Sequence, residues 1–150
     1  MKRTNAMKWV GCVIGAMLLS VSASGQYKQP VPEGFVRLDA DEIKTGAIFG
    51  DPSKPGIYVT RNLFAPGRGS HPHFHDQARY ITVIKGTWWV GSGPKFDKDA
   101  TTPVPAGSFV VHHANQIHWD GAKDEEVIVQ IMGIGPSATI RVDESGKPKN

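Results

Sequence analysis

Apolar and β-branched residues recur along the chain in short stretches, separated by stretches rich in Gly, Pro, Ser and Asp. Each apolar stretch has the length and composition of a β-strand. The predicted strands cover residues 35–38, 47–49, 57–64, 80–84, 87–90, 108–111, 127–134 and 139–142. The segments between them that contain breakers predict turns, and they are residues 51–56, 65–67, 85–86 and 103–107.

Helical periodicity is almost absent from the chain. Only residues 39–44 have the pattern of a short helical turn, so the fold is predicted to be all-β. Short strands with turn signals about every ten residues are typical of a sandwich or a barrel. We prefer a jelly-roll barrel, formed by one domain over residues 35–144. The polar segment 91–101 is its longest connection, and it is either solvated or overhangs the barrel mouth.

The first 25 residues have the order of segments of a secretory signal peptide. Three basic residues come first, an apolar run covers residues 9–19, and small residues follow up to Gly25. A helix needs about 20 apolar residues to cross a bilayer, so the run is too short for a permanent anchor. Cleavage after Ala23 or after Gly25 satisfies the small-residue rule. The mature protein is therefore predicted to be exported, periplasmic or secreted, with no stable membrane insertion.

Removal of the signal peptide changes the charge of the chain. The chain has 17 basic and 14 acidic residues, and the signal peptide holds three of the basic ones, which leaves 14 of each. No basic stripe remains for nucleic acid or an anionic membrane, so neither partner is expected. Cys12, the single cysteine, is also removed, and stability must come from packing. Residues 26–34 are predicted to form an extended arm, and residues 145–150 a flexible tail.

Histidines cluster just after the predicted turn at residues 65–67. His71, His73 and His75 occupy alternate positions, which share one face of an extended strand. The same parity continues through Gln77 and Arg79. These side chains are therefore predicted to look into the barrel. Two neutral imidazoles on one rigid strand can converge on a metal ion, and a further ligand must come from elsewhere in the chain.

At these residues the chain resembles the cupin family. The first cupin motif is Gly, five residues, His-x-His, three or four residues, Glu, six residues and Gly. This register is occupied here by Gly67, His73, His75, Arg79 and Gly86. The second motif is Gly, five residues, Pro-x-Gly, two residues, His, three residues and Asn. Counting from the first glycine, its positions are held by Gly107, His113, Asn115, His118 and Ala122.

The resemblance implies a cupin jelly roll, a double-stranded β-barrel, with His73, His75 and His118 as metal ligands. Three imidazoles suit one divalent transition metal ion, which is iron, zinc, copper or nickel. The Glu of the first motif is Arg79 here, and a guanidinium has no lone pair to donate to a metal. The fourth position therefore falls to water, to a substrate, or to a side chain. The side chains that remain open are Gln77, His71 and His113.

Arg79 brings a positive charge next to the predicted metal ion. A negative group must offset it, and the candidates are Asp76, Asp120, a bound hydroxide, or an anionic small-molecule ligand that bridges the metal and the guanidinium. In the last case Arg79 is a clamp for a carboxylate or an enolate. Gln77 shares its face by parity and would also contact this ligand. Trp119, beside the third histidine, either lines the substrate cavity or belongs to the core.

The function predicted first is that of a metalloenzyme, of the dioxygenase or isomerase type, acting on a small organic acid or an enolisable carbonyl compound. Strand parity places no carboxylate in the pocket, which weakens proton abstraction and leaves oxygenation or plain binding. The alternative is a non-catalytic cupin that binds a small ligand or a metal, or acts as a sensor.

A homo-oligomer, a dimer, is expected. Of Trp88 and Trp89, one is predicted to pack in the core and one at the oligomer interface, and His112 is predicted to be structural or exposed.

Overall fold

The computed structural model describes residues 45–149. The predicted signal peptide, the arm, the strand at residues 35–38 and the helical turn at residues 39–44 lie outside the described residues. Described residues form ten strands: β1 (Gly46–Phe49), β2 (Gly56–Phe64), β3 (His73–His75), β4 (Arg79–Lys85), β5 (Thr87–Ser92), β6 (Thr102–Pro105), β7 (Phe109–His112), β8 (His118–Gly121), β9 (Val127–Gly135) and β10 (Thr139–Arg141). No described residue lies in a helix, so the described part of the chain contains no helix able to cross a membrane.

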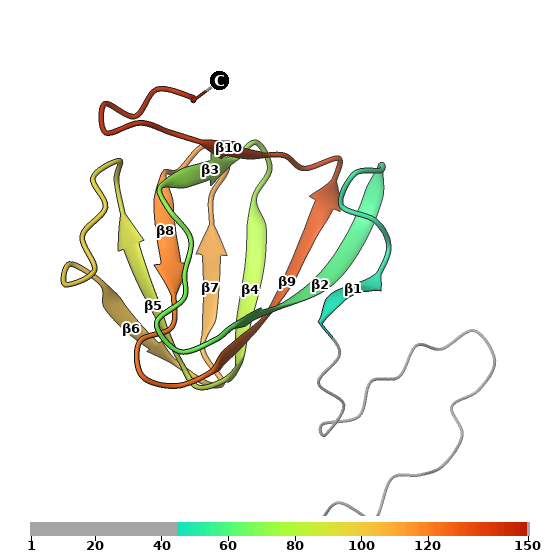
Figure 1. Ribbon diagram of the computed structural model, residues 1–150. Helices are drawn as coiled ribbons and strands as arrows, with labels where there is room; N and C mark the ends of the chain where they lie inside the picture. The colour runs from blue at the N-terminus through green and yellow to red at the C-terminus, as the bar shows by residue number, and fades with distance from the viewer. Residues whose placement is uncertain (1–44, 150) are drawn as a thin grey trace, which may run out of the picture. The chain divides into compact units, whose positions relative to one another are not determined.

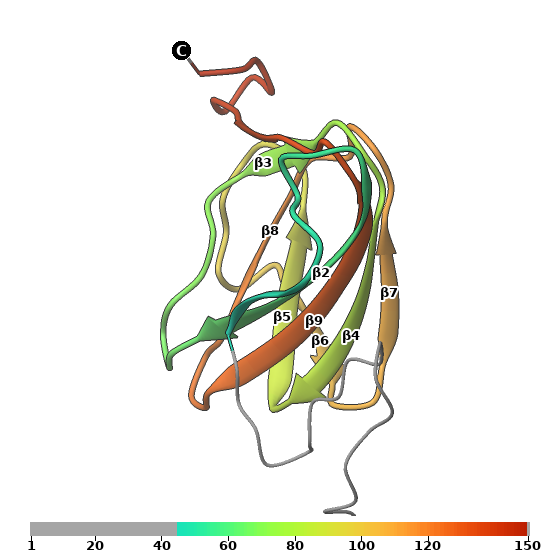
Figure 2. The same cartoon turned by 90° about the vertical axis from the view of Figure 1, so that its right-hand side faces the viewer.

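The strands form two antiparallel sheets of five strands each. The first sheet has the order β1-β2-β9-β4-β7, and the second has the order β10-β3-β8-β5-β6. Figures 1 and 2 show the two sheets facing each other, with β3 and β10 closing one end of the space between them. The all-β, jelly-roll prediction is confirmed.

Most of the predicted strands form with nearly the predicted bounds. The segment that forms β6 was instead predicted to be part of a turn. It contains Pro103 and Pro105, which pair with Trp89 and Thr87 of β5. A proline cannot donate to a strand ladder, so it is tolerated only where its nitrogen faces no partner strand. Because β6 is the outermost strand of the second sheet, both prolines fit there.

The hydrophobic core fills the space between the sheets below the histidines. Its fully buried side chains include Tyr58, Ile81, Val83, Trp88, Val127 and Val129. Trp88 is 1% exposed, whereas its neighbour Trp89 points outward and lies under the ammonium group of Lys123, 3.8 Å from the ring centroid. The predicted alternation of the two tryptophans is therefore confirmed.

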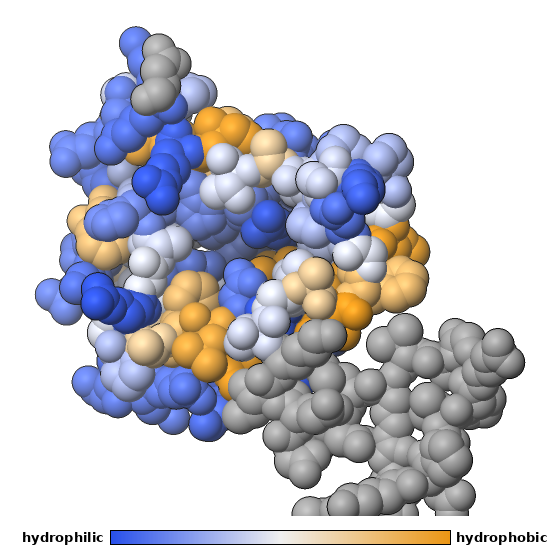
Figure 3. All heavy atoms as spheres, turned by 45° about the vertical axis from the view of Figure 1, so that its right-hand side comes forward, coloured by the Kyte–Doolittle hydropathy of each residue, from blue (hydrophilic) through white to orange (hydrophobic). Residues whose placement is uncertain are grey.

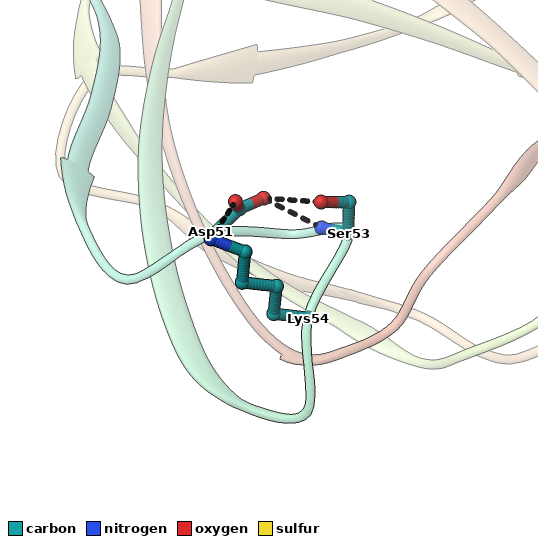
Figure 4. Close-up of polar contacts among 3 residues, drawn as sticks. All are labelled: Asp51, Ser53 and Lys54. Carbon is teal, nitrogen blue, oxygen red and sulfur yellow. Dashed lines mark hydrogen bonds and ion pairs between the residues drawn. The ribbon is translucent and has the colours of Figure 1, made fainter.

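The connection between β1 and β2 is a turn built around one carboxylate (Figure 4). Oδ1 of Asp51 accepts hydrogen bonds from the backbone N–H of Ser53 at 2.9 Å and from its hydroxyl at 2.7 Å. Oδ2 forms an ion pair with Lys54 at 3.4 Å. The hydrogen bonds from Ser53 lower the pKa of Asp51 below its usual value, so the turn keeps its anion at neutral pH.

The end of the described chain folds back on itself. Val142 forms a bridge with Pro148, and the N–H of Lys149 donates to the carbonyl of Arg141 at 2.9 Å. Residues 145–149 of the predicted flexible tail are therefore held by backbone hydrogen bonds.

Large apolar side chains are exposed on the strands of the first sheet. Ile57 pairs with Ile134 and Tyr80 pairs with Met132 across neighbouring strands, so these four share a sheet face. The exposed set on this sheet is Phe49, Ile57, Leu63, Tyr80, Ile84, Phe109, Met132 and Ile134. Figure 3 shows several such hydrophobic areas beside a hollow surrounded mainly by hydrophilic residues. Exposed apolar areas of this extent are typical of interaction surfaces, while the expected homo-oligomer stays a prediction.

Candidate metal centre

Three buried histidines meet inside the barrel. His73 and His75 come from β3 and His118 from β8, and His73 pairs directly with His118 across the two strands. One ring nitrogen of each histidine lies within 4.8 Å of the others. The ring centroids of His73 and His118 are 4.4 Å apart. The predicted cluster is therefore assembled by one strand pairing.

Backbone carbonyls fix which nitrogen of each ring is available. Nδ1 of His73 donates to the carbonyl of His71 at 2.7 Å, and Nδ1 of His118 donates to the carbonyl of Gln116 at 2.9 Å. Nδ1 of His75 faces the carbonyl of Ala138 at 3.2 Å. Because a carbonyl oxygen only accepts, the neutral rings of His73 and His118 carry their protons on Nδ1 and keep a lone pair on Nε2. Nδ1 of His75 also lies 3.2 Å from the hydroxyl of Thr139, which can either donate or accept. This arrangement is the usual outer support of a metal-binding histidine.

The turn before β8 corresponds to part of the second cupin motif and contains a residue in the left-handed region. Asn115 stands where that motif has glycine, and its φ is 63°. Asparagine tolerates this left-handed region better than other side chains, so the replacement leaves the turn intact. The N–H of Asn115 donates to the carbonyl of His75 at 2.7 Å and ties the turn to β3.

A cavity of about 190 Å³ opens beside the histidines. Its lining is half polar and half apolar and consists of Asn62, Phe64, Ser70, His73, His75, Arg79, Ile81, Trp88, His112, His118, Asp120, Val129, Ile131 and Thr139. Arg79 lies on this wall, as predicted, where β4 begins. Its Nε is buried without a hydrogen-bond partner. A bound acceptor would satisfy this donor.

Strand parity placed two of the titratable lining residues outside the pocket, although Asp120 was a candidate counter-charge for Arg79. His112 at the end of β7 is buried, its ring centroid lies 3.8 Å from that of His118, and its Nε2 has no hydrogen-bond partner. It shares parity with Val110, which packs on the core, and this parity could have revealed it. Asp120 lies two residues after His118 on the same face of β8, so the expectation of a pocket without a carboxylate was wrong.

The three side chains suggested as a fourth metal ligand all lie outside the cavity. Gln77 is exposed, because β3 ends at His75 in one sheet and β4 begins at Arg79 in the other, so strand parity does not carry across the crossing. His113 is exposed in the turn after β7. His71 is exposed, and its ring packs against Phe96 with a centroid distance of 5.1 Å.

Trp119 does not line the histidine cavity either. It directly follows His118, and neighbouring residues of a strand point to opposite faces. Its ring is buried on the outer side of the second sheet, 5.9 Å from Phe96 in the loop after β5. There it lines a separate outer cleft of about 350 Å³ with Trp89. The polar loop at residues 93–101 therefore covers the outer side of this sheet.

The electrostatics of the pocket keep His75, His112 and His118 neutral. Burial, and next the charge of Arg79, lower the pKa of His75 to about 3. Burial lowers the pKa of His118 to about 4, and burial and the neighbouring His118 lower that of His112 to about 3. Burial raises the pKa of Asp120, against the hydrogen bond from Ser70. At neutral pH the imidazole lone pairs are therefore available to a metal ion.

The metal-free protein is expected to lose stability in mild acid. Above the unfolded pKa of about 6.5 these histidines are neutral in both states, but below it only the unfolded chain binds their protons. Stability is therefore lost as the pH falls from 6.5 toward the folded values. Three such histidines lose about 5 kcal/mol between pH 6.5 and 5, and Asp120 offsets at most about 2 kcal/mol, so we expect a net loss of about 3 kcal/mol.

Urea unfolding in the presence of a chelator measures this slope. The His112→Leu variant removes one of the shifted groups, so its slope should be smaller by up to one proton. Equal stability at pH 6.5 and pH 5 would contradict the expectation.

Comparison with solved structures places this fold among known proteins. A cupin 2 domain-containing protein from Halorhodospira halophila is 15% identical over 67% of this chain and 70% of that chain, with a TM-score of 0.56. A conserved protein with a double-stranded β-helix domain from Klebsiella pneumoniae is 21% identical over 69% of this chain and 89% of that chain, with a TM-score of 0.51.

A cupin-like protein from Thermotoga maritima is 25% identical over 55% of this chain, with a TM-score of 0.47, and the chain spans 62% of that protein's length. No protein-family model matches the chain, and no functionally characterised protein matches it in sequence. The chain has the fold of these two proteins, the double-stranded β-helix or cupin fold. The three-histidine cluster fits a metal-binding site in that fold.

Proposed function

We propose that the protein is an exported cupin that binds one divalent transition metal ion through His73, His75 and His118. The observation that carries this proposal is the set of three buried imidazoles that converge inside the barrel, each with its Nδ1 beside a backbone carbonyl. The ligand set favours iron, zinc, copper or nickel over magnesium or calcium, which prefer oxygen ligands. Three protein ligands leave an open position on the ion.

The reaction proposed is of the dioxygenase or isomerase type, on a small organic acid or an enolisable carbonyl compound. When bound, the metal would supply a Lewis acid or a site for O₂. Arg79 supports an anionic substrate, because its buried and unpartnered Nε offers a donor to a carboxylate from the cavity wall. A cavity of about 190 Å³ suits a small molecule, and its apolar side would hold the hydrocarbon part of one.

A non-catalytic role is the second candidate, in which the protein captures a small anion or a metal ion, or acts as a sensor. One observation favours it. The only carboxylate among the residues lining the described pocket belongs to Asp120, and its Oδ1 is already bound by the hydroxyl of Ser70. A carboxylate held in this way is a poor mobile base. Turnover of enolisable acids by the metal-loaded protein, or its absence, distinguishes the two roles.

Metal content is the direct test of the site. We expect about one transition-metal ion per chain in protein purified without an affinity tag, and a loss of at least ten-fold in His73→Ala and His118→Ala, because each removes one of three ligands. Elemental analysis provides the measurement. His71→Ala is the matched control, since this exposed histidine contributes only its backbone carbonyl. Sub-stoichiometric metal in the wild type, or unchanged metal in His73→Ala, would remove the basis of the proposal.

Export and cleavage of residues 1–25 are part of the same proposal, and they rest on the signal-peptide pattern of the sequence. Intact mass of the protein recovered from the periplasm or medium should correspond to a chain beginning after Ala23 or after Gly25. A full-length chain retained in the cytoplasm would contradict export.

A further inference from the structure

We infer that the part of the cavity wall formed by Arg79, Trp88 and His112 is a subsite for a small α-hydroxy acid. In this assignment Arg79 and Trp88 bind the carboxylate, and His112 binds the hydroxyl next to it. The inference deepens the proposed function and rests on the binding of a small anion at Arg79, but it requires no metal ion. Trp88 and His112 are then the residues that select the ligand.

Each of these three side chains has a buried polar atom without a hydrogen-bond partner among the described residues. The atoms are Nε of Arg79, Nε1 of Trp88 and Nε2 of His112, and all three residues line the same cavity. Trp88 is 1% exposed and His112 is 6% exposed. Because an unpaired buried polar atom is destabilising, most such atoms in proteins have a partner. Since no described residue supplies these partners, a molecule in the cavity has to supply them.

The fold holds the three polar groups close together. Arg79 and His112 are direct partners in the pairing of β4 with β7, and directly opposed residues share a sheet face with their Cβ atoms about 5 Å apart. Trp88 comes from β5 in the facing sheet, and its ring centroid lies 5.4 Å from that of His112. One small ligand can therefore contact all three side chains.

The hydrogen-bonding capacity of these groups indicates the ligand. Guanidinium and indole N–H groups only donate, so Arg79 and Trp88 need acceptors, and a carboxylate supplies two acceptor oxygens with a charge opposite to that of Arg79. An imidazole nitrogen carries either a hydrogen or a lone pair, and a hydroxyl pairs with it in both cases. Because His112 adjoins Arg79 across the strands, this hydroxyl belongs on the carbon next to the carboxylate.

The rest of the cavity fits the remainder of such an acid. The ring centroid of His112 lies 3.8 Å from that of His118, so the hydroxyl end of the ligand would lie toward the histidine cluster. Ile81, Val129 and Ile131 line the apolar side and would contact its hydrocarbon part. The volume of about 190 Å³ has room for a short hydrocarbon chain besides the two oxygen groups.

The test compares lactate with isobutyrate, two acids of similar shape that differ by a hydroxyl in place of a methyl group. Isothermal titration calorimetry on protein stripped of metal measures both affinities. The wild type should bind lactate at least about ten-fold more tightly, because isobutyrate leaves the polar atom of His112 unpaired. His112→Phe should reduce this preference to less than about three-fold and leave isobutyrate binding intact. His113→Phe, the same change at the exposed neighbouring histidine, should keep the wild-type preference.

Nuclear magnetic resonance reports the contact with Trp88 in the wild-type protein, so this measurement does not depend on the folding of a core variant. The indole N–H resonance of Trp88 should shift downfield as either acid is added, because the N–H gains an acceptor. The indole resonances of Trp89 and Trp119 are the internal control, since both rings line the outer cleft instead and should not move.

The outcomes separate this inference from the proposed function. If the two acids bind equally and Arg79→Met abolishes both, the proposed anion site stands while the α-hydroxy acid subsite fails. If a preference for lactate disappears in His112→Phe but elemental analysis finds no metal, this inference stands while the metal function fails. A preference that His112→Phe retains would overturn the role of His112. If neither acid binds and the Trp88 resonance does not move, water alone fills the cavity and the inference is wrong.

Discussion

Replacement of Arg79 by glutamate is expected to tighten Zn²⁺ binding by at least about 100-fold, equivalent to about 2.7 kcal/mol. The variant restores the carboxylate of the cupin motif at the start of β4, on the wall of the histidine cavity. The charge of this side chain changes by two units, from +1 to −1, beside a divalent ion. At about 6 Å and an effective dielectric constant of about 20, each unit contributes several kcal/mol before screening, so a 100-fold gain is a conservative figure.

Competition titration with a chelator measures the gain. Arg79→Gln, which removes the positive charge without adding a negative one, should fall between the wild type and Arg79→Glu. Arg68→Glu makes the same change of charge at an exposed position on the outer cleft and should alter the affinity by less than about three-fold. Equal Zn²⁺ affinity of Arg79→Glu and the wild type would show that the guanidinium does not oppose metal binding.

The same variant should lose any affinity for small carboxylic acids. In the proposed function the guanidinium binds the anionic part of the substrate, and a carboxylate in its place repels that group. Isothermal titration of a series of small acids measures this loss. Retained binding in Arg79→Glu would place the anion elsewhere in the cavity.

Gly91→Ala is expected to destabilise the protein by at least about 3 kcal/mol, the range of severe packing errors. Gly91 on β5 pairs with Trp119 on β8. A Cβ at this position would lie 2.2 Å from Cε2 and 2.3 Å from Cζ2 of the indole. Trp119 is 4% exposed and its ring packs against Phe96, so the ring can shift only by giving up this contact.

Urea unfolding measures this loss, and Ser92→Ala is the control at the neighbouring exposed position of the same strand. The control should change the free energy of unfolding by less than about 0.5 kcal/mol. The Gly91→Ala variant should also bind 1-anilinonaphthalene-8-sulfonate, because displacement of Trp119 opens the outer cleft. A Gly91→Ala protein as stable as the wild type would show that the indole has room to shift.

Much of the site could be read from local pattern and spacing. His73 and His75 share a face because the side chains of any strand alternate, and the motif spacing added His118 from a distant segment. The wrong predictions arose where the alternation of side chains was extended across a break between two strands, or where this alternation was not applied. Gln77 lies where the chain crosses between sheets. For Trp119, alternation along β8 excludes the substrate-cavity alternative and leaves the buried one.

The sequence by itself determined most of the strand segments, the all-β class and the shared face of His73 and His75, because these depend on short-range periodicity. His118 was assigned only through the resemblance to the second cupin motif. Tertiary structure decided the rest of the pocket. His112, Arg79 and Asp120 come from β7, β4 and β8, and only the packing of two sheets brings them to one cavity. Which charges oppose each other there depends on long-range pairing and burial, and no local pattern encodes either.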